Sequence, residues 1–168
     1  MNIEQTFFGK EAPLPVLANY IIFRYHEDLR KRFTELMTLA EFVEKKHIRN
    51  HACPLGLHKT LSNFAFEIKK HMYKEELILF PLINLGKVVM EEKQLKDLKV
   101  EHEAHERQMD QLRIMTEDFS LPEDACQVWK SLYKGLAKLE IELMEHNHLE
   151  NSILYPRAIK MSTSLRIP

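Results

Sequence analysis

Apolar residues recur along this chain at alternating steps of three and four positions, in four separate segments. The segments cover about residues 16–47, 55–85, 90–117 and 123–160, with interruptions at 48–54, at Gly86 and at 118–122. Such alternation places apolar side chains on one face of an α-helix, and the chain lacks the alternating pattern of a strand. The stripes continue through Ile22, Ile78 and Ile153, which we expect to be buried. The pattern therefore predicts an all-α protein.

Four amphipathic helices with short connections pack most simply as an up-down-up-down four-helix bundle. Since 168 residues are enough for one compact core, we expect a single domain over residues 1–168, with the bundle at about 16–160 and short tails. Ser120 and Glu123 have the spacing of a capping box, which predicts the start of the fourth helix there. Pro81 and Pro156 are expected to kink or end their helices.

The composition narrows the class of protein. The chain has 24 basic residues against 25 acidic ones, a balance that argues against a dedicated nucleic-acid surface. Its apolar stretches are too short to span a bilayer, and the N-terminus lacks the pattern of a signal peptide. Cys53 and Cys126 lie far apart without a CxxC motif, which indicates neither a disulfide framework nor a zinc ribbon. We therefore expect a cytoplasmic protein that binds neither nucleic acid nor membrane.

Each apolar stripe carries a histidine where an apolar residue is expected, and two stripes also carry a glutamate. These residues are His26, His71, Glu75, His102, His146 and Glu150. Burying an ionised carboxylate without a partner costs several kcal/mol, so something must compensate each glutamate. A single buried histidine is most often a core imidazole hydrogen-bonded to a neighbour. The spacing of the whole set favours a different explanation.

One motif occurs twice in the chain. Residues 71–81 and 146–156 both read H-x-x-x-E-x-x-I-L-[FY]-P. Histidine and glutamate at i and i+4 lie within about 40° of each other on one helix face. The separation of histidines repeats as well, at 45 residues from His26 to His71 and 44 from His102 to His146. Two similar hairpins would thus bring four imidazoles and two carboxylates to one point, which predicts a dinuclear metal site.

The ligand types indicate the metal. Imidazole with bridging carboxylate suits iron, and the absence of thiolate ligands argues against iron–sulfur and blue-copper centres. We predict two non-haem iron ions bridged by Glu75 and Glu150 and by an oxo or hydroxo group, with a position open to a small diatomic molecule. Ferritin-like proteins use Glu-x-x-His instead. One match to that motif, Glu145 and His148, points away from the stripe.

These segments resemble the hemerythrin-like domain of the iron–sulfur cluster repair di-iron proteins, also called the repair-of-iron-centres family. The resemblance covers roughly residues 20–160 and rests on Arg24-Tyr-His26, 71–81, Glu101-His102-Glu103 and 143–158. It implies a hemerythrin-like bundle with a di-iron centre on the six residues named above. It also implies repair of iron–sulfur clusters damaged by nitric oxide or oxidative stress, through diatomic binding, redox change and iron donation to iron–sulfur client proteins.

The sequence departs from that family at its N-terminus. Fuller members carry a small cysteine-containing domain before the bundle, whereas only 25 residues precede His26 here, without a cysteine. We therefore expect any thiol chemistry of that domain to be absent or to come from another protein. We expect the protein to be a monomer or a homodimer.

Three other functions are compatible with these residues. A hemerythrin-like protein that binds or senses oxygen or nitric oxide without turnover would form a reversible adduct and transfer no iron. A purely structural bundle, whose buried histidines and glutamates bond one another, would fold fully without metal. A di-iron enzyme that reduces nitric oxide would consume the gas in the presence of an electron donor.

Other polar residues lie near the stripes. His105 is one turn from His102 and is the candidate for a fifth imidazole, although four histidines are favoured. His47 lies 21 residues after His26, about 31 Å along a straight helix, so we expect it to cap or pack. Glu67 and Glu101 are expected on solvated helix faces rather than in hydrogen bonds to ligand imidazoles. Packing is expected of Tyr25.

Several further residues are expected at the surface. They are His51, His58, His148 and the basic clusters Arg30–Arg32 and Lys69–Lys70.

Overall fold

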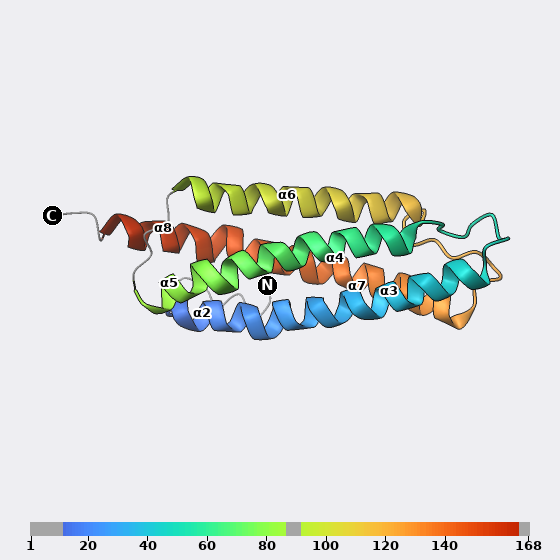
Figure 1. Ribbon diagram of the computed structural model, residues 1–168, viewed down its shortest axis with the longest axis horizontal. Coiled ribbons are helices and arrows are strands. Elements are labelled where there is room, and N and C mark those ends of the chain that lie inside the picture. Colours follow the sequence, from blue (N-terminus) through green and yellow to red (C-terminus); the bar gives the residue numbers. More distant parts are fainter. Residues whose placement is uncertain (1–11, 87–91, 165–168) are drawn as a thin grey trace.

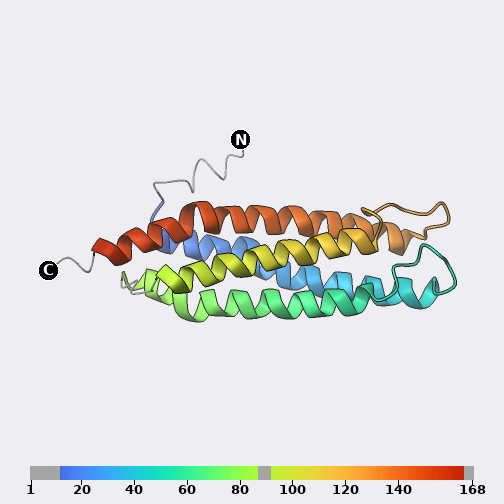
Figure 2. The same cartoon turned by 90° about the horizontal axis from the view of Figure 1, so that it is seen from above.

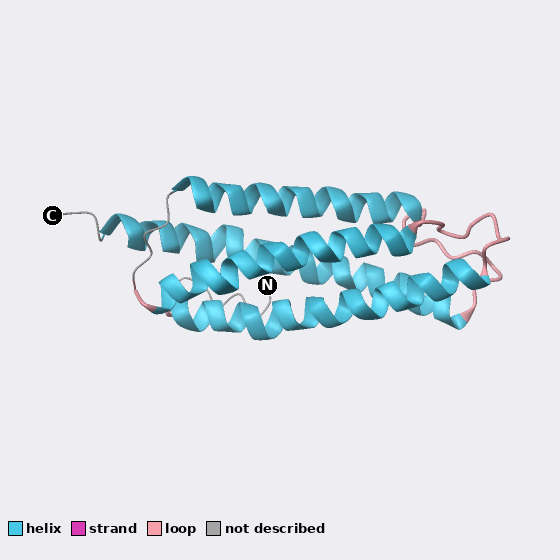
Figure 3. Cartoon of the chain, in the orientation of Figure 1, coloured by secondary structure: helices cyan, strands magenta, loops and turns pink. Residues whose placement is uncertain are grey.

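The computed structural model describes residues 12–86 and 92–164, and every regular element in these ranges is a helix (Figure 3). Four helical arms lie side by side in alternating directions (Figures 1 and 2). The predicted all-α, up-down-up-down bundle is thereby confirmed. The predicted start of the third helix near residue 90 and the outer parts of the tails lie outside the described residues.

Three of the arms consist of two α-helices joined by a π-helical turn. The first arm is α2 (Leu14–Ile21), η1 (Ile22–His26) and α3 (Glu27–Lys46). The second is α4 (Leu57–Lys74), η2 (Glu75–Leu79) and α5 (Phe80–Asn84). The third arm is the single helix α6 (Glu92–Met115). The fourth is α7 (Gln127–Leu149), η3 (Glu150–Leu154) and α8 (Tyr155–Ser164).

Each π turn begins or ends at a predicted metal ligand. His26 is the last residue of η1, and Glu75 and Glu150 are the first residues of η2 and η3. A π turn contains an extra residue, so it moves the buried face of the helix by one position. π turns inside α-helices are rare and often occur at functional sites, which agrees with their positions here.

Because of this shift, the residues that face the core beyond the ligands differ from those that the apolar stripe predicted. Ile78 is 52% exposed, and Ile22 and Ile153 are only partly buried. The neighbouring residues Ile21, Leu79 and Leu154 are fully buried in their place.

Pro81 and Pro156 were expected to kink or end their helices, and the structure shows that they do not end them. Pro81 and Pro156 are the second residues of α5 and α8, which continue to Asn84 and Ser164. Proline is tolerated in the first turn of a helix, because the N–H that it lacks would have no partner there.

The fourth helix starts later than predicted. α7 begins at Gln127, with Cys126 as its N-cap and no side-chain capping bond. Glu117, Asp118 and Phe119 all have φ between 48° and 62°, and the Ser120 N–H donates back to Thr116 and Glu117. Ser120 therefore belongs to the turn that ends α6, and the predicted capping box is wrong.

Two apolar clusters fill the bundle, one on each side of the predicted ligands. The larger cluster lies among α3, α4, α6 and α7 and includes Phe64 and Trp129. The smaller one lies among α2, α5, α8 and the start of α6 and includes Phe80 and Tyr155. In every arm, the change from one cluster to the other occurs at the predicted ligands, which therefore form a polar layer across the bundle.

None of the helices within 12–86 and 92–164 is long and apolar enough to cross a membrane.

Candidate metal centre

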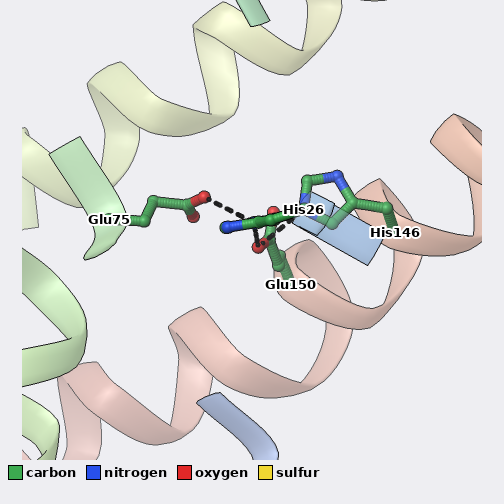
Figure 4. A group of neighbouring side chains, drawn as sticks. All are labelled: His26, Glu75, His146 and Glu150. Carbon is green, nitrogen blue, oxygen red and sulfur yellow. Dashed lines mark hydrogen bonds and ion pairs between the residues drawn. The ribbon is translucent and has the colours of Figure 1, made fainter. Parts of the chain in front are cut away.

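All six predicted ligands meet in the polar layer. None of their side chains is more than 2% exposed. They come from all four arms: His26 from the first, His71 and Glu75 from the second, His102 from the third, and His146 and Glu150 from the fourth. Figure 4 shows four of them, His26, Glu75, His146 and Glu150, with their polar ends facing one another.

The four imidazoles form two close pairs, and each pair joins the two hairpins. His26 Nε2 lies 3.1 Å from His146 Nε2, which connects the first arm to the fourth. His71 Nε2 lies 2.8 Å from His102 Nε2, which connects the second arm to the third. The two pairs define two adjacent positions at which nitrogen donors converge.

Glu150 lies between the two histidine pairs. Its Oε1 is 2.9 Å from His146 Nε2, and its Oε2 is 3.1 Å from His102 Nε2. Glu75 is placed differently, because its Oε2 alone faces both pairs, at 3.4 Å from His26 Nε2 and 3.5 Å from His71 Nε2. Glu150 thus offers one oxygen to each pair, whereas Glu75 offers a single oxygen to both.

The ligand atoms fall into two groups that could each hold a metal ion. In the first position, donor atoms of His26, Glu75, His146 and Glu150 all lie within 4.8 Å of one another. In the second position, the same holds for His71, His102 and Glu150. Glu75 Oε2 and Glu150 Oε1 are buried, and the described residues give neither oxygen a hydrogen bond of good geometry, although imidazole nitrogens lie close by. Since buried carboxylates need a compensating positive charge, and nitrogen and oxygen donors suit first-row transition metals, these residues fit two metal ions.

The other ring nitrogen of three histidines is held by a polar side chain. His26 Nδ1 lies 2.7 Å from Glu76 Oε1, and Arg30 donates to the same oxygen at 2.6 Å. His102 Nδ1 lies 3.1 Å from Asn151 Oδ1. Partners of this kind fix the orientation of a ligand ring and raise its basicity. Glu76 and Asn151 were not predicted, but each directly follows the glutamate of the repeated motif, so the internal repeat contained a signal for both.

Glu101 was expected on a solvated helix face, and that prediction is wrong. Its Oε2 lies 2.9 Å from His71 Nδ1, and Lys74 donates to its Oε1, so it is a partner of a ligand imidazole rather than a solvated residue. The hydrogen bond with His71, together with Lys74, lowers the pKa of Glu101 to about 2, against the opposing effect of burial.

The basic cluster Arg30–Arg32 was also expected at the surface. Arg30 contacts Glu76, and Arg32 pairs with Glu142, so of these three residues only Lys31 is exposed as predicted.

The electrostatics of the layer keep Glu150 ionised. Burial raises the pKa of Glu150, but the charge of His146 and the hydrogen bond with His102 outweigh it and hold this pKa well below its usual range. Burial lowers the pKa of His26, and hydrogen bonds with Glu150, Glu75 and Glu76 reverse that effect, so the net pKa is well above its usual value. The charges of these buried side chains therefore depend on one another.

Comparison with known proteins identifies the family of this chain. The sequence model of the hemerythrin HHE cation binding domain matches residues 17–158. The chain belongs to the hemerythrin HHE cation-binding family. It is also 40% identical over 151 residues to the iron-sulfur cluster repair protein YtfE of Yersinia pestis (strain Pestoides F), which covers 90% of this chain and 68% of the relative. The protein of the same name from Yersinia pseudotuberculosis serotype O:1b (strain IP 31758) matches to the same extent.

Two aromatic residues cover the end of this HHE domain's polar layer nearest α5 and α8. The ring of Phe80 stacks on His26 at 5.8 Å, and the ring of Tyr155 stacks on His102 at the same centroid distance. The Tyr155 hydroxyl also donates to Glu75 Oε1 at 2.5 Å, with Glu150 Oε2 at 3.4 Å. Burial, followed by the charges of Glu150 and Glu75, raises the pKa of Tyr155 well above its usual value, so the phenol stays neutral. This hydrogen bond was not predicted; the [FY] position of the motif was its only signal.

His105 is buried beside the centre but belongs to neither donor group. Its ring lies 5.1 Å from that of His71 and 6.1 Å from that of His102. Its Nδ1 has no hydrogen-bond partner among the described residues. Burial, and then the charges of His71 and His102, lower the pKa of His105 to about 3, so the ring is neutral at ordinary pH.

The remaining predictions for polar residues hold with small changes. His47 is the C-cap of α3, where its Nε2 lies 3.2 Å from Cys126 Sγ and its ring packs on Trp129. Tyr25 is buried and packs edge-on against Tyr20. Glu67 pairs with exposed Lys70 on the surface. His51, His148 and Lys69 are exposed, and His58 is partly exposed.

Proposed function

We propose that this HHE domain holds two non-haem iron ions on His26, His71, Glu75, His102, His146 and Glu150. The observation that carries the proposal is the pairing of four imidazole nitrogens around two fully buried carboxylates, with Nε2–Nε2 distances of 3.1 and 2.8 Å. Nitrogen and carboxylate donors without thiolate suit iron. Glu150, which offers one oxygen to each histidine pair, would be the principal bridge, and Glu75, which offers Oε2 to both pairs, would be the second.

Bound iron would supply binding of a small diatomic molecule and reversible change of redox state. The side chains of this chain supply the surroundings. The six ligands are at most 2% exposed, so bulk water is kept out of the layer. Glu76, Glu101 and Asn151 hold the rings of His26, His71 and His102 in fixed orientations.

We further propose that the protein repairs iron–sulfur clusters damaged by nitric oxide or oxidative stress, by binding the diatomic molecule and donating iron to iron–sulfur client proteins. The support is 40% identity, over 90% of this chain, to relatives named iron-sulfur cluster repair proteins. The proposed location is the cytoplasm, where the unpaired thiols of Cys53 and Cys126 would stay reduced.

The enclosure of the centre favours a second candidate function. Because all six ligands are buried, the layer admits small molecules more readily than a protein-bound cluster. A hemerythrin-like protein that binds or senses oxygen or nitric oxide without turnover would need only such a centre.

Metal loading tests the first step. The metal-free protein would be loaded with ferrous iron in the absence of oxygen, followed by metal analysis and absorption spectroscopy after exposure to air. We expect two iron ions per chain and a charge-transfer band of paired ferric ions. The double variant Glu75→Ala/Glu150→Ala, shown to be helical by circular dichroism, should bind neither. If the wild-type protein folds normally but takes up no stoichiometric iron, the buried histidines and glutamates are structural and the proposed metal centre is wrong.

A repair assay separates the two functions. An iron–sulfur enzyme inactivated with nitric oxide would be incubated with the loaded protein, with the double variant as the control. Recovery of enzyme activity together with loss of iron from the loaded protein supports repair. A stable, reversible gas adduct with no recovery supports binding or sensing.

A further inference from the structure

The outer side of the second arm carries large apolar side chains that are exposed to solvent. Four of them are between 44% and 73% exposed: Phe66, Tyr73, Leu77 and Ile78. Phe66, Tyr73 and Leu77 follow one another at steps of seven and four residues, so they form a second stripe, on the side of the helix that points away from the core. The π turn η2 turns Ile78 outward beside them. Exposed apolar patches of this kind mark interaction sites.

Two shallow hollows adjoin this stripe. One follows the stripe itself and the other lies between α3 and α4, and Phe66 and Lys69 line both. Among the described residues, every charged side chain that lines these hollows is basic: Arg30, Lys69, Lys70 and Lys74. The formal charge of the whole chain is −1, so this part of the surface differs from the average. The apolar stripe with its four basic neighbours forms the α4 surface.

Ion pairs within the chain use part of this positive charge. Three of the basic side chains each pair with one glutamate, namely Arg30 with Glu76, Lys70 with Glu67 and Lys74 with Glu101. Lys69 instead lies over the ring of Tyr73, at 5.5 Å from its centroid. Ion pairs that solvent reaches contribute little to stability, so carboxylates of a partner can replace them.

The α4 surface reaches the edge of the polar layer at Lys74. This side chain lines one hollow and also donates to Glu101 Oε1, whose other oxygen lies 2.9 Å from His71 Nδ1. A protein that binds to the α4 surface therefore lies beside the arm that supplies His71 and Glu75.

We propose that the α4 surface docks an acidic face of an iron–sulfur client protein, with carboxylates against the basic side chains and apolar side chains in the two hollows. The inference rests on the proposed repair function. The charge of the surface selects this occupant. A second copy of the chain, paired through the same face about a two-fold axis, would bring two sets of four basic side chains together, and like charges across an interface are costly. A flat lipid surface would leave the hollow between α3 and α4 unfilled.

Binding to a ferredoxin tests the inference, because a ferredoxin is a small iron–sulfur protein and one with a strongly acidic surface can be chosen. The ferredoxin would be fluorescently labelled and treated with nitric oxide, and its affinity for the iron-loaded protein measured by anisotropy at several salt concentrations. We expect saturable binding that weakens as salt rises, since charged groups contribute to it. Phe66→Ser/Lys69→Glu should bind about tenfold more weakly, because it removes an aromatic anchor and reverses a charge.

This double variant has a matched control on another face. Phe66 and Lys69 are exposed, so the variant should keep the iron content and helicity of the wild type. Ile141→Ser/Lys134→Glu makes the same kinds of change at exposed positions of α7, diagonally opposite α4, and should keep full affinity. In the repair assay, the α4 variant should restore the damaged enzyme about tenfold more slowly, whereas the control should match the wild type.

The outcomes separate failure of the docking surface from failure of the repair function. Equal affinity and equal repair by the wild type and the α4 variant overturn the docking surface and leave the repair function intact. A wild type that binds the ferredoxin more tightly than the α4 variant, but restores no enzyme activity, supports the docking surface and overturns repair.

Two other occupants are tested with the same variants. Binding of vesicles that contain anionic phospholipid, lost in the α4 variant and without binding of the ferredoxin, assigns the surface to lipid and overturns the inference. A wild type that sediments as a dimer, beside an α4 variant that sediments as a monomer, assigns the surface to a second copy and also overturns it.

Discussion

The two hairpins of this bundle provide the same ligands but surround them differently. The first hairpin (residues 14–84) and the second (residues 92–164) each contribute one predicted ligand histidine, then a ligand histidine and a glutamate four residues apart. Around them, Glu76 in the first hairpin corresponds to Asn151 in the second, and Phe80 to Tyr155. An internal repeat has thus kept the residues that could bind metal while its other positions have diverged.

The divergence changes the charge around each ring. The Nδ1 atoms of His26 and His71 face carboxylates that also pair with Arg30 and Lys74. His102 faces the neutral amide of Asn151, and the Nδ1 of His146 has no hydrogen-bond partner among the described residues. Each of the two metal positions therefore combines one ring supported by a carboxylate with one ring that is not. The difference therefore lies between the hairpins, and the pairing of histidines across them gives the two metal positions similar support.

The largest expected effect comes from comparing the two glutamates. Glu150→Ala should remove both metal positions, because Glu150 belongs to both donor groups. Glu75→Ala leaves two imidazoles and Glu150 at each position, so it should lower the iron content less than Glu150→Ala does. Iron per chain, measured after gel filtration of loaded protein, checks this, with circular dichroism to establish folding. Equal losses in the two variants would contradict the unequal roles of the glutamates.

A smaller effect is expected from the residues that hold the rings. Glu101→Gln replaces the charged partner of His71, and we expect iron affinity to fall by about 10- to 100-fold. Asn151→Ala removes a neutral partner of His102 and should have a smaller effect, because hydrogen bonds with an ionised partner are roughly twice as strong. Chelator competition measures both. Glu67→Gln, one turn before His71 on the surface, is the matched control and should leave the affinity unchanged.

The smallest effect is expected at His105. The equivalent position of the first hairpin is Leu29, which is fully buried, so His105→Leu makes the two hairpins alike at this point. Because no described residue bonds the buried Nδ1 of His105, its removal should stabilise the metal-free protein by about 1 kcal/mol in urea unfolding. Iron content should not change. Loss of one ion in this variant would instead make His105 a ligand.

Much of the candidate site could be predicted from the sequence. The three–four alternation depends on the pitch of the α-helix, and the i, i+4 spacing of His71 and Glu75, repeated in His146 and Glu150, places each pair on one face. Since an amphipathic helix must bury that face, these polar groups had to meet inside the bundle. The fold class and the six converging residues follow from such local rules.

The rest was decided by tertiary structure. Local spacing does not determine how far each helix is rotated or displaced along its neighbour, so the pairing of His26 with His146 across the hairpins could not be predicted. The π turn at Glu75–Leu79 shifts the buried face from Ile78 to Leu79, and the three–four alternation does not reveal such a shift. Glu101 looks like an ordinary surface residue until α4 packs beside α6 and brings His71 to it. The sequence by itself determined which chemical groups enter the core, and only the packing of the arms decided which of them touch.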